Sequence, residues 1–210
     1  MTSETISEPN KRGRPRSEEV EQAILKATVR LLDERGLQAL TIEDVASLAK
    51  VGKTSIYRRW PSKGILALEA FLSEFLQLQP PIDTGSLEGD LNAALSAWVG
   101  AVAGTPTGRN LVALIAQAQS DPDLAIAWSE RVVMAARNQH RSMIERAIAR
   151  NEIPRDSDVD VLMDMLYGPA YHRLLQGHLP LTEGFAQQVV AVVVAGAKAG
   201  GAVPLTIHKA

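Results

Sequence analysis

Residues 41–63, TIEDVASLAKVGKTSIYRRWPSK, carry the strongest structural signal in this chain. Thr41 stands where a helix N-cap would, and Asp44 follows three residues later, as in a capping box with Asp in place of Glu. Val51-Gly52 predicts a break after this first short helix, and residues 53–60 predict a second one before a proline. Two short helices joined by a tight turn are typical of a helix-turn-helix, whose second helix projects into the major groove of DNA.

The second of these helices has an apolar and a polar side. Ile56 and Trp60 are four residues apart, so both are expected to face the core. The opposite side then carries hydrogen-bond donors and one aromatic ring, namely Lys53, Thr54, Tyr57 and Arg58. Such a surface suits phosphates and base edges. For Tyr57, simple packing against the core is the alternative, because Tyr is commonly half-buried.

The same residues resemble the DNA-binding signature of the TetR family of bacterial regulators. The similarity covers about residues 17–75, with matches at Thr41, Val45, Ala46, Ala49, Val51, Ser55, Ile56, Tyr57, Arg59, Trp60 and Lys63. Two positions depart from the signature: Lys50 replaces a Gly in the turn, and Gly52 replaces a Ser that caps the recognition helix. A Gly cap is only slightly less favourable than Ser, so the fold is expected to survive.

The resemblance implies roles for the matching residues and for the basic N-terminus. Thr41, Tyr57 and Lys63 would bind phosphate, as could Arg58, while Lys53, Thr54 and Ser55 would approach the bases. Arg14 and Arg16, which lie in a basic stretch, would reach the minor groove. The family further implies a homodimer, a palindromic operator as the DNA partner, and a small-molecule effector of unknown identity that releases a repressor.

The predicted fold class is all-α, with an N-terminal three-helix helix-turn-helix domain and a C-terminal helical domain for ligand binding and dimerisation. Residues 1–16 predict a flexible basic arm, and residues 17–61 the helix-turn-helix domain, whose first helix opens at Ser17 and ends at Gly36. Residues 62–80 predict a connecting helix, and residues 81–210 the C-terminal domain. Helices are expected within that domain at residues 87–103, 111–119, 124–150, 158–176 and 182–198.

The last two of these helices are the candidates for dimerisation. The final helix is apolar nearly all round, which indicates burial on more than one side. Two helices from each subunit would form a four-helix bundle, with interface residues Leu162, Leu166, Phe185, Val189 and Val193.

Large side chains, some with a polar tip, are the candidates for a ligand pocket. They are Trp98, Trp128, Met134, Tyr167 and Tyr171. A place in the core or at the dimer interface is the alternative for each of them. Charged residues are sparse over residues 91–119, which favours an apolar, uncharged effector.

Composition argues against several other classes of protein. The chain has no Cys, so neither a disulfide nor a thiolate centre is expected. Its N-terminus lacks an apolar signal segment and its longest apolar run, residues 189–197, is too short to span a bilayer, so a cytoplasmic protein without a membrane partner is expected. His140, His172 and His178 lack metal-ligand spacing, and neither a cofactor nor a catalytic residue is expected. A DNA-binding regulator without an effector, or an all-helical enzyme, are the alternative functions.

Overall fold

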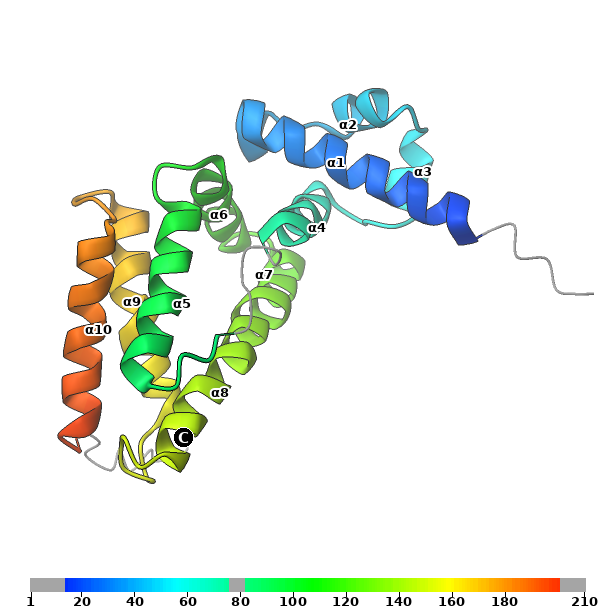
Figure 1. Ribbon diagram of the computed structural model, residues 1–210. Coiled ribbons are helices and arrows are strands. Elements are labelled where there is room, and N and C mark those ends of the chain that lie inside the picture. The colour runs from blue at the N-terminus through cyan, green and yellow to red at the C-terminus, as the bar shows by residue number, and fades with distance from the viewer. Residues whose placement is uncertain (1–13, 76–81, 201–210) are drawn as a thin grey trace, which may run out of the picture.

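The computed structural model describes residues 14–75 and 82–200, with side chains from Ser17 onward, and Figure 1 shows its architecture. Every regular element in these two ranges is helical, which confirms the all-α prediction. Helices α1 (Arg14–Ala39), α2 (Ile42–Ala49) and α3 (Lys53–Tyr57) form a small N-terminal domain. Helix α4 (Lys63–Phe75) leads from it into a larger helical domain.

The first helix differs from its prediction at both ends. It begins at Arg14, three residues before the predicted Ser17. Gly36 breaks it, as predicted, with φ 76° and ψ 169°, and one further turn follows up to Ala39. The positive φ explains why this residue is Gly, which has no Cβ to clash in that region.

The helix-turn-helix forms through the predicted cap. The Thr41 hydroxyl accepts a hydrogen bond from the Asp44 N–H at 3.1 Å and starts α2. Lys50 ends α2 in the left-handed conformation, with φ 55°, where the family signature has Gly. Helix α3 ends at Tyr57, earlier than predicted, and the next residues turn so that Trp60 packs into the core beside Ile56.

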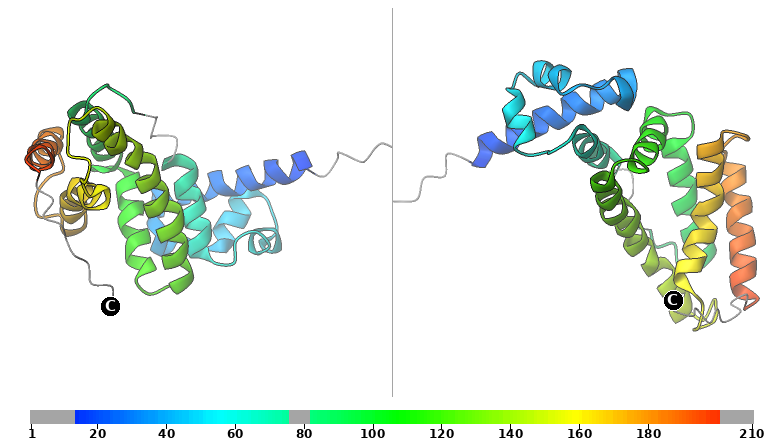
Figure 2. Two further views of the ribbon diagram at one scale, coloured as in Figure 1. Left: turned by 90° about the horizontal axis from the view of Figure 1, so that it is seen from below. Right: turned by 180° about the vertical axis from the view of Figure 1, so that it is seen from behind.

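The C-terminal domain contains the elements α5 (Leu87–Val102), α6 (Pro106–Ala118), α7 (Pro122–Trp128), η2 (Ser129–Met134), α8 (Ala135–Ala149), α9 (Val159–Gln176) and α10 (Glu183–Lys198). Helix α6 starts five residues before the predicted Leu111, because Thr105 caps it and Pro106 occupies its first turn. The predicted long helix over 124–150 is interrupted at η2, a π-helical turn. Figure 2 shows that α9 and α10 lie side by side, on the side of the molecule away from α1.

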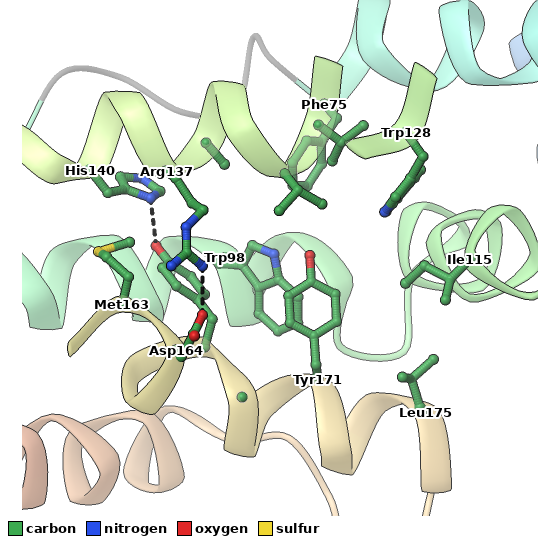
Figure 3. Close-up of a pocket in the computed structure, with 15 residues that line it drawn as sticks. Phe75, Trp98, Ile115, Trp128, Arg137, His140, Met163, Asp164, Tyr171 and Leu175 are labelled. Carbon is green, nitrogen blue, oxygen red and sulfur yellow. Dashed lines mark hydrogen bonds and ion pairs between the residues drawn. The ribbon is translucent and has the colours of Figure 1, made fainter. Parts of the chain in front are cut away.

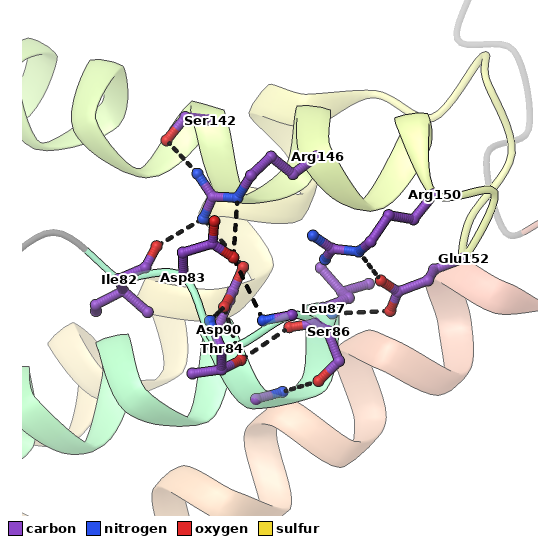
Figure 4. Close-up of polar contacts among 12 residues, drawn as sticks. Ile82, Asp83, Thr84, Ser86, Leu87, Asp90, Ser142, Arg146, Arg150 and Glu152 are labelled. Carbon is purple, nitrogen blue, oxygen red and sulfur yellow. Dashed lines mark hydrogen bonds and ion pairs between the residues drawn. The ribbon is translucent and has the colours of Figure 1, made fainter.

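A buried carboxylate ties the start of α5 to α8 (Figure 4). The side chain of Asp90 is fully buried and accepts hydrogen bonds from the Thr84 N–H at 2.6 Å and the Thr84 hydroxyl at 2.7 Å. Arg146 of α8 donates to its other oxygen at 3.1 Å and to the Ile82 carbonyl at 2.6 Å. Burial alone would raise the pKa of Asp90, but these hydrogen bonds outweigh it and hold the pKa below its ordinary value.

The left-handed conformation of Lys50 generates a prediction about stability. A residue with a Cβ is strained there by about 1–2 kcal/mol, whereas Gly is not. We expect Lys50→Gly to raise the free energy of unfolding by about 0.5–1 kcal/mol, as measured from the midpoint of urea denaturation.

Lys50→Ala is the matched control, because it removes the same charge but keeps the Cβ. It should give no such gain. Equal midpoints for the two variants would show that the charge, and not the backbone conformation, sets the stability at this position.

Candidate nucleic-acid interface and internal pocket

The outer side of α3 is exposed as its sequence pattern predicted. Lys53, Thr54 and Arg58 are exposed, Tyr57 is 52% exposed, and Ser55 is partly covered. Tyr57 therefore does not pack into the core, which was the alternative for it. Helix α3 belongs to the N-terminal domain, which lies on the side of the molecule away from α10 (Figure 1).

Two of the predicted DNA contacts are already paired within the chain. The Lys53 ammonium lies 2.7 Å from a Glu43 carboxylate oxygen, and the hydrogen bond between them raises the pKa of Lys53 and lowers that of Glu43. The Thr41 hydroxyl donates to the Asp44 carboxylate at 2.9 Å while it caps α2. Both acids lie in the first turn of α2, so DNA phosphates would compete with them for these donors.

Lys63 lies at the junction of α1 and α4. Its ammonium donates to the carbonyls of Leu37 at 3.1 Å and Gln38 at 3.4 Å, near the end of α1. The favourable interaction of a cation with C-terminal carbonyls accounts for this position. Lys63 thus links α1 to the first turn of α4, in addition to its predicted phosphate contact.

Arg59 has a structural place that the sequence reasoning did not assign. Its guanidinium donates to the Ser17 hydroxyl at 2.8 Å and to the Ser55 carbonyl at 3.1 Å, so it fastens α1 to α3. The predicted minor-groove residues Arg14 and Arg16 lie outside the described side chains.

The C-terminal domain and the end of α4 line a partly open pocket of about 440 Å³ (Figure 3). Of the five residues predicted to line a pocket, the structure brings four together in its walls: Trp98, Trp128, Tyr167 and Tyr171. Met134 is the exception, because the π-helical turn η2 points it outward, where it is 48% exposed, and places Val132 and Val133 in the wall instead.

Sequence reasoning missed several residues of this pocket, namely Phe75 from α4, Ala136, Arg137 and His140 from α8, and Met163 and Asp164 from α9. Those on α8 recur at the spacing of one helix face, which is the signal that could have revealed them.

The polar groups of the pocket are mostly paired with one another. Arg137 donates to Asp164 at 2.5 Å and to Asp160 at 3.2 Å. The Tyr167 hydroxyl is 3.1 Å from His140 Nδ1, and the two rings stack. Burial lowers the pKa of His140 and raises that of Tyr167, so both are neutral at pH 7.

Three of the residues predicted for a dimer interface lie instead in the core of the single chain. Leu166 is fully buried, and Val189 and Val193 are 9% and 6% exposed, because α10 packs against α5 and α9. The other two, Leu162 and Phe185, are half-buried. One side of α10 is exposed in the single chain, so its burial on further sides by a partner stays a prediction.

The outer surface of α9 and α10 has its own apolar residues. Val161 and Met165 are 41% and 53% exposed on α9, and Val192 is 67% exposed on α10. Ala191 and Ala195 are also exposed on α10. We call these five residues the α9–α10 outer face.

Two kinds of feature are absent from the described ranges. None of the helices there is long and apolar enough to cross a membrane. Nor do three or more His, Cys, Asp or Glu side chains in these ranges gather as a metal ion would require.

Comparison with known proteins gives the family. Residues 24–70 match the profile of bacterial regulatory proteins of the tetR family, and residues 81–193 match that of the tetracyclin repressor-like C-terminal domain. An uncharacterised HTH-type transcriptional regulator of Bacillus subtilis, YdeS, is 32% identical over 92% of this chain and 97% of its own. The DNA-binding transcriptional repressor TetR of Mycobacteroides abscessus is 29% identical over 83% of this chain and 92% of its own.

A solved structure agrees with these sequence relatives. The crystal structure of a TetR family transcription regulator, 37% identical, superposes with a TM-score of 0.75 over 85% of this chain and 98% of its own. The match therefore extends over the DNA-binding and the C-terminal domains alike. The chain belongs to the TetR family of DNA-binding transcriptional regulators.

Proposed function

We propose that this regulator is a cytoplasmic homodimeric repressor that binds a palindromic operator and is released when a small molecule fills the internal pocket. The observation that carries the proposal is the position of α4. Its first residue, Lys63, contacts the end of α1 in the DNA-binding domain, and its last residue, Phe75, lines the pocket. The two are joined by one helix with a rise of about 18 Å, so a displacement at the pocket reaches the DNA-binding domain.

Helix α4 is held to α7 and η2 by two kinds of contact. Phe71 and Phe75 stack with centroids 4.9 Å apart, and Phe71 lies 6.2 Å from Trp128 at the end of α7. One turn earlier on α4, Glu69 forms an ion pair with Arg131 of η2. A ligand that separates α4 from α7 and η2 must change both contacts.

The α9–α10 outer face supports a two-fold dimer. Apolar side chains exposed together on two neighbouring helices are typical of surfaces that associate, and pairing these helices with their copies would form a four-helix bundle. A dimer presents two recognition helices to major grooves about 34 Å apart, which calls for a palindromic operator. The similarity to a named repressor supports repression over activation. We assign the chain no enzymatic activity.

Three variants test the proposed contacts with DNA. We expect Lys53→Ala to weaken binding of the best operator by about 5–150-fold while sequence choice relaxes, because a base-edge contact is lost. Lys63→Ala should weaken all sequences alike and lower the salt-dependence slope by about one, because a phosphate contact is lost. Fluorescence anisotropy with selected and scrambled duplexes measures both.

Arg155→Ala is the control, because Arg155 is an exposed cation in the turn between α8 and α9. It should bind both duplexes like the wild type. If Lys53→Ala kept full discrimination between the duplexes, α3 would not read the bases through this residue.

The dimer is tested at Val192. We expect Val192→Glu to shift the protein from dimer to monomer at micromolar concentration in sedimentation equilibrium, because a charge would be buried at the interface without a partner. Ile126→Glu is the matched control, since Ile126 is 58% exposed on α7, away from α9 and α10. A Val192→Glu protein that stays dimeric would place the interface elsewhere.

Reciprocal binding tests the release mechanism. A compound that lowers operator affinity by some factor must bind the free protein more tightly than the operator complex by the same factor. Calorimetry with and without operator measures both. Equal compound affinity in the two titrations would leave a DNA-binding regulator without an effector.

Glu69→Gln tests whether the contact between α4 and η2 carries the effect of the ligand to the DNA-binding domain. The substitution breaks the ion pair with Arg131, and Glu69 does not line the pocket. We expect the factor by which the compound lowers operator affinity to fall by about 2–30-fold. The affinity for the compound alone and the affinity for the operator alone should change little. Glu130→Gln, an exposed acid one residue from Arg131, should leave the coupling unchanged.

A further inference from the structure

The charged groups around the pocket disfavour an ionised ligand. Arg137 is neutralised by Asp164 and Asp160, and Asp160 also pairs with Arg141 at 2.8 Å. The remaining titratable side chains of the wall are His140, Tyr167 and Tyr171, which burial keeps neutral at pH 7. An anion or a cation in this pocket would have to break the ion pair of Arg137 or stay unpaired, and either is unfavourable.

The walls of the pocket favour a flat aromatic ligand. Figure 3 shows Trp98 and Tyr171 on one side of the cavity and Phe75 and Trp128 on the other. Trp98 and Tyr171 are in contact, with centroids 4.9 Å apart, so this wall is a continuous aromatic surface. An aromatic ring between the two sides would gain offset or edge-to-face contacts that an alkyl chain of equal size lacks.

One hydrogen-bond donor points into this space. The Tyr171 ring contacts the Trp98 indole, and its hydroxyl proton has no acceptor among the described residues. Figure 3 shows Tyr171 rising from α9 with its hydroxyl toward Phe75 and Trp128. Burial raises the pKa of Tyr171 to about 12, so the hydroxyl keeps its proton and donates. The other tyrosine, Tyr167, already uses its hydroxyl on His140.

We propose that the effector of this regulator is an uncharged aromatic molecule bearing a carbonyl-type acceptor, which lies between the Trp98–Tyr171 and Phe75–Trp128 walls and accepts a hydrogen bond from Tyr171. The inference rests on the proposed function in one respect, that this pocket is the effector site. A volume of about 440 Å³ lies within the range of pockets that hold drug-sized molecules.

Four probes of similar size separate the features of this proposal. Methyl naphthyl ketone has the ring and the acceptor, naphthoate adds a charge, ethylnaphthalene lacks the acceptor, and a saturated methyl ketone lacks the ring. Calorimetry on the full-length protein should give the tightest binding for methyl naphthyl ketone, by about tenfold over each of the others. Equal or tighter binding of naphthoate or of the saturated ketone would overturn the proposal.

The hydroxyl is tested by a matched pair of variants. Tyr171→Phe should lower the affinity for methyl naphthyl ketone about tenfold, to that of ethylnaphthalene, and leave ethylnaphthalene binding unchanged. Tyr167→Phe also removes one hydroxyl from the wall, but it should keep the preference for the ketone. Loss of the preference in both variants, or in neither, would contradict the role of Tyr171.

Operator release by the same probes distinguishes this inference from the proposed function. If methyl naphthyl ketone binds with the expected selectivity but leaves the operator complex intact at saturation, the ligand chemistry stands and the release mechanism fails. If a charged or purely aliphatic compound releases the operator and competes for the pocket, the release mechanism stands and the proposed ligand class is wrong.

Discussion

The contact between the first turn of α4 and the turn joining α6 to α7 holds the two domains together. A Cβ on Gly64 would lie 3.1 Å from Gln117 Nε2, 3.2 Å from Leu124 Cδ2 and 3.3 Å from Asp121 Oδ2. A glycine therefore lets α4 approach the C-terminal domain this closely. Beside it, the Asn110 amide of α6 donates to Asp33 of α1 at 2.9 Å. The DNA-binding domain is thus fixed to the C-terminal domain at α4 and α6, so a change in the angle of α4 would alter this contact.

Much of the N-terminal domain could be predicted because its signals are local. The hydroxyl of Thr41 caps α2 through a backbone N–H only three residues away. Gly36 and Lys50 both have a positive φ, and each lies at a turn between helical segments that are adjacent in sequence. Ile56 faces the core as helical periodicity predicts, and Trp60 is also buried, although α3 ends at Tyr57 and a turn brings Trp60 to the core. The pairing of Lys53 with Glu43 could not be foreseen, since it depends on how α3 crosses α2.

Prediction was weaker in the C-terminal domain because several helices there share one core. An apolar stripe shows that a helix face is covered, but it does not show whether the same chain or a second copy covers it. Leu166, Val189 and Val193 illustrate this, since neighbouring helices of the same chain cover surfaces that the sequence assigned to a partner. Met134 illustrates a different limit. A π-helical turn shifts the register of the side chains beyond it, and the sequence carries no strong signal for such a turn.

The two walls of the pocket differ in what lies behind them, and this decides which of them a ligand would move. Trp98 and Tyr171 belong to α5 and α9, which pack on α10, and in the proposed dimer α9 and α10 are further held by the partner. Phe75 lies at the last described turn of α4, whose other contacts are with the DNA-binding domain and with α6 and α7. A ligand that widens the pocket would therefore displace α4 before the wall formed by α5 and α9. The proposed dimer would then stay fixed while a tilt of α4 changed the separation of its two recognition helices.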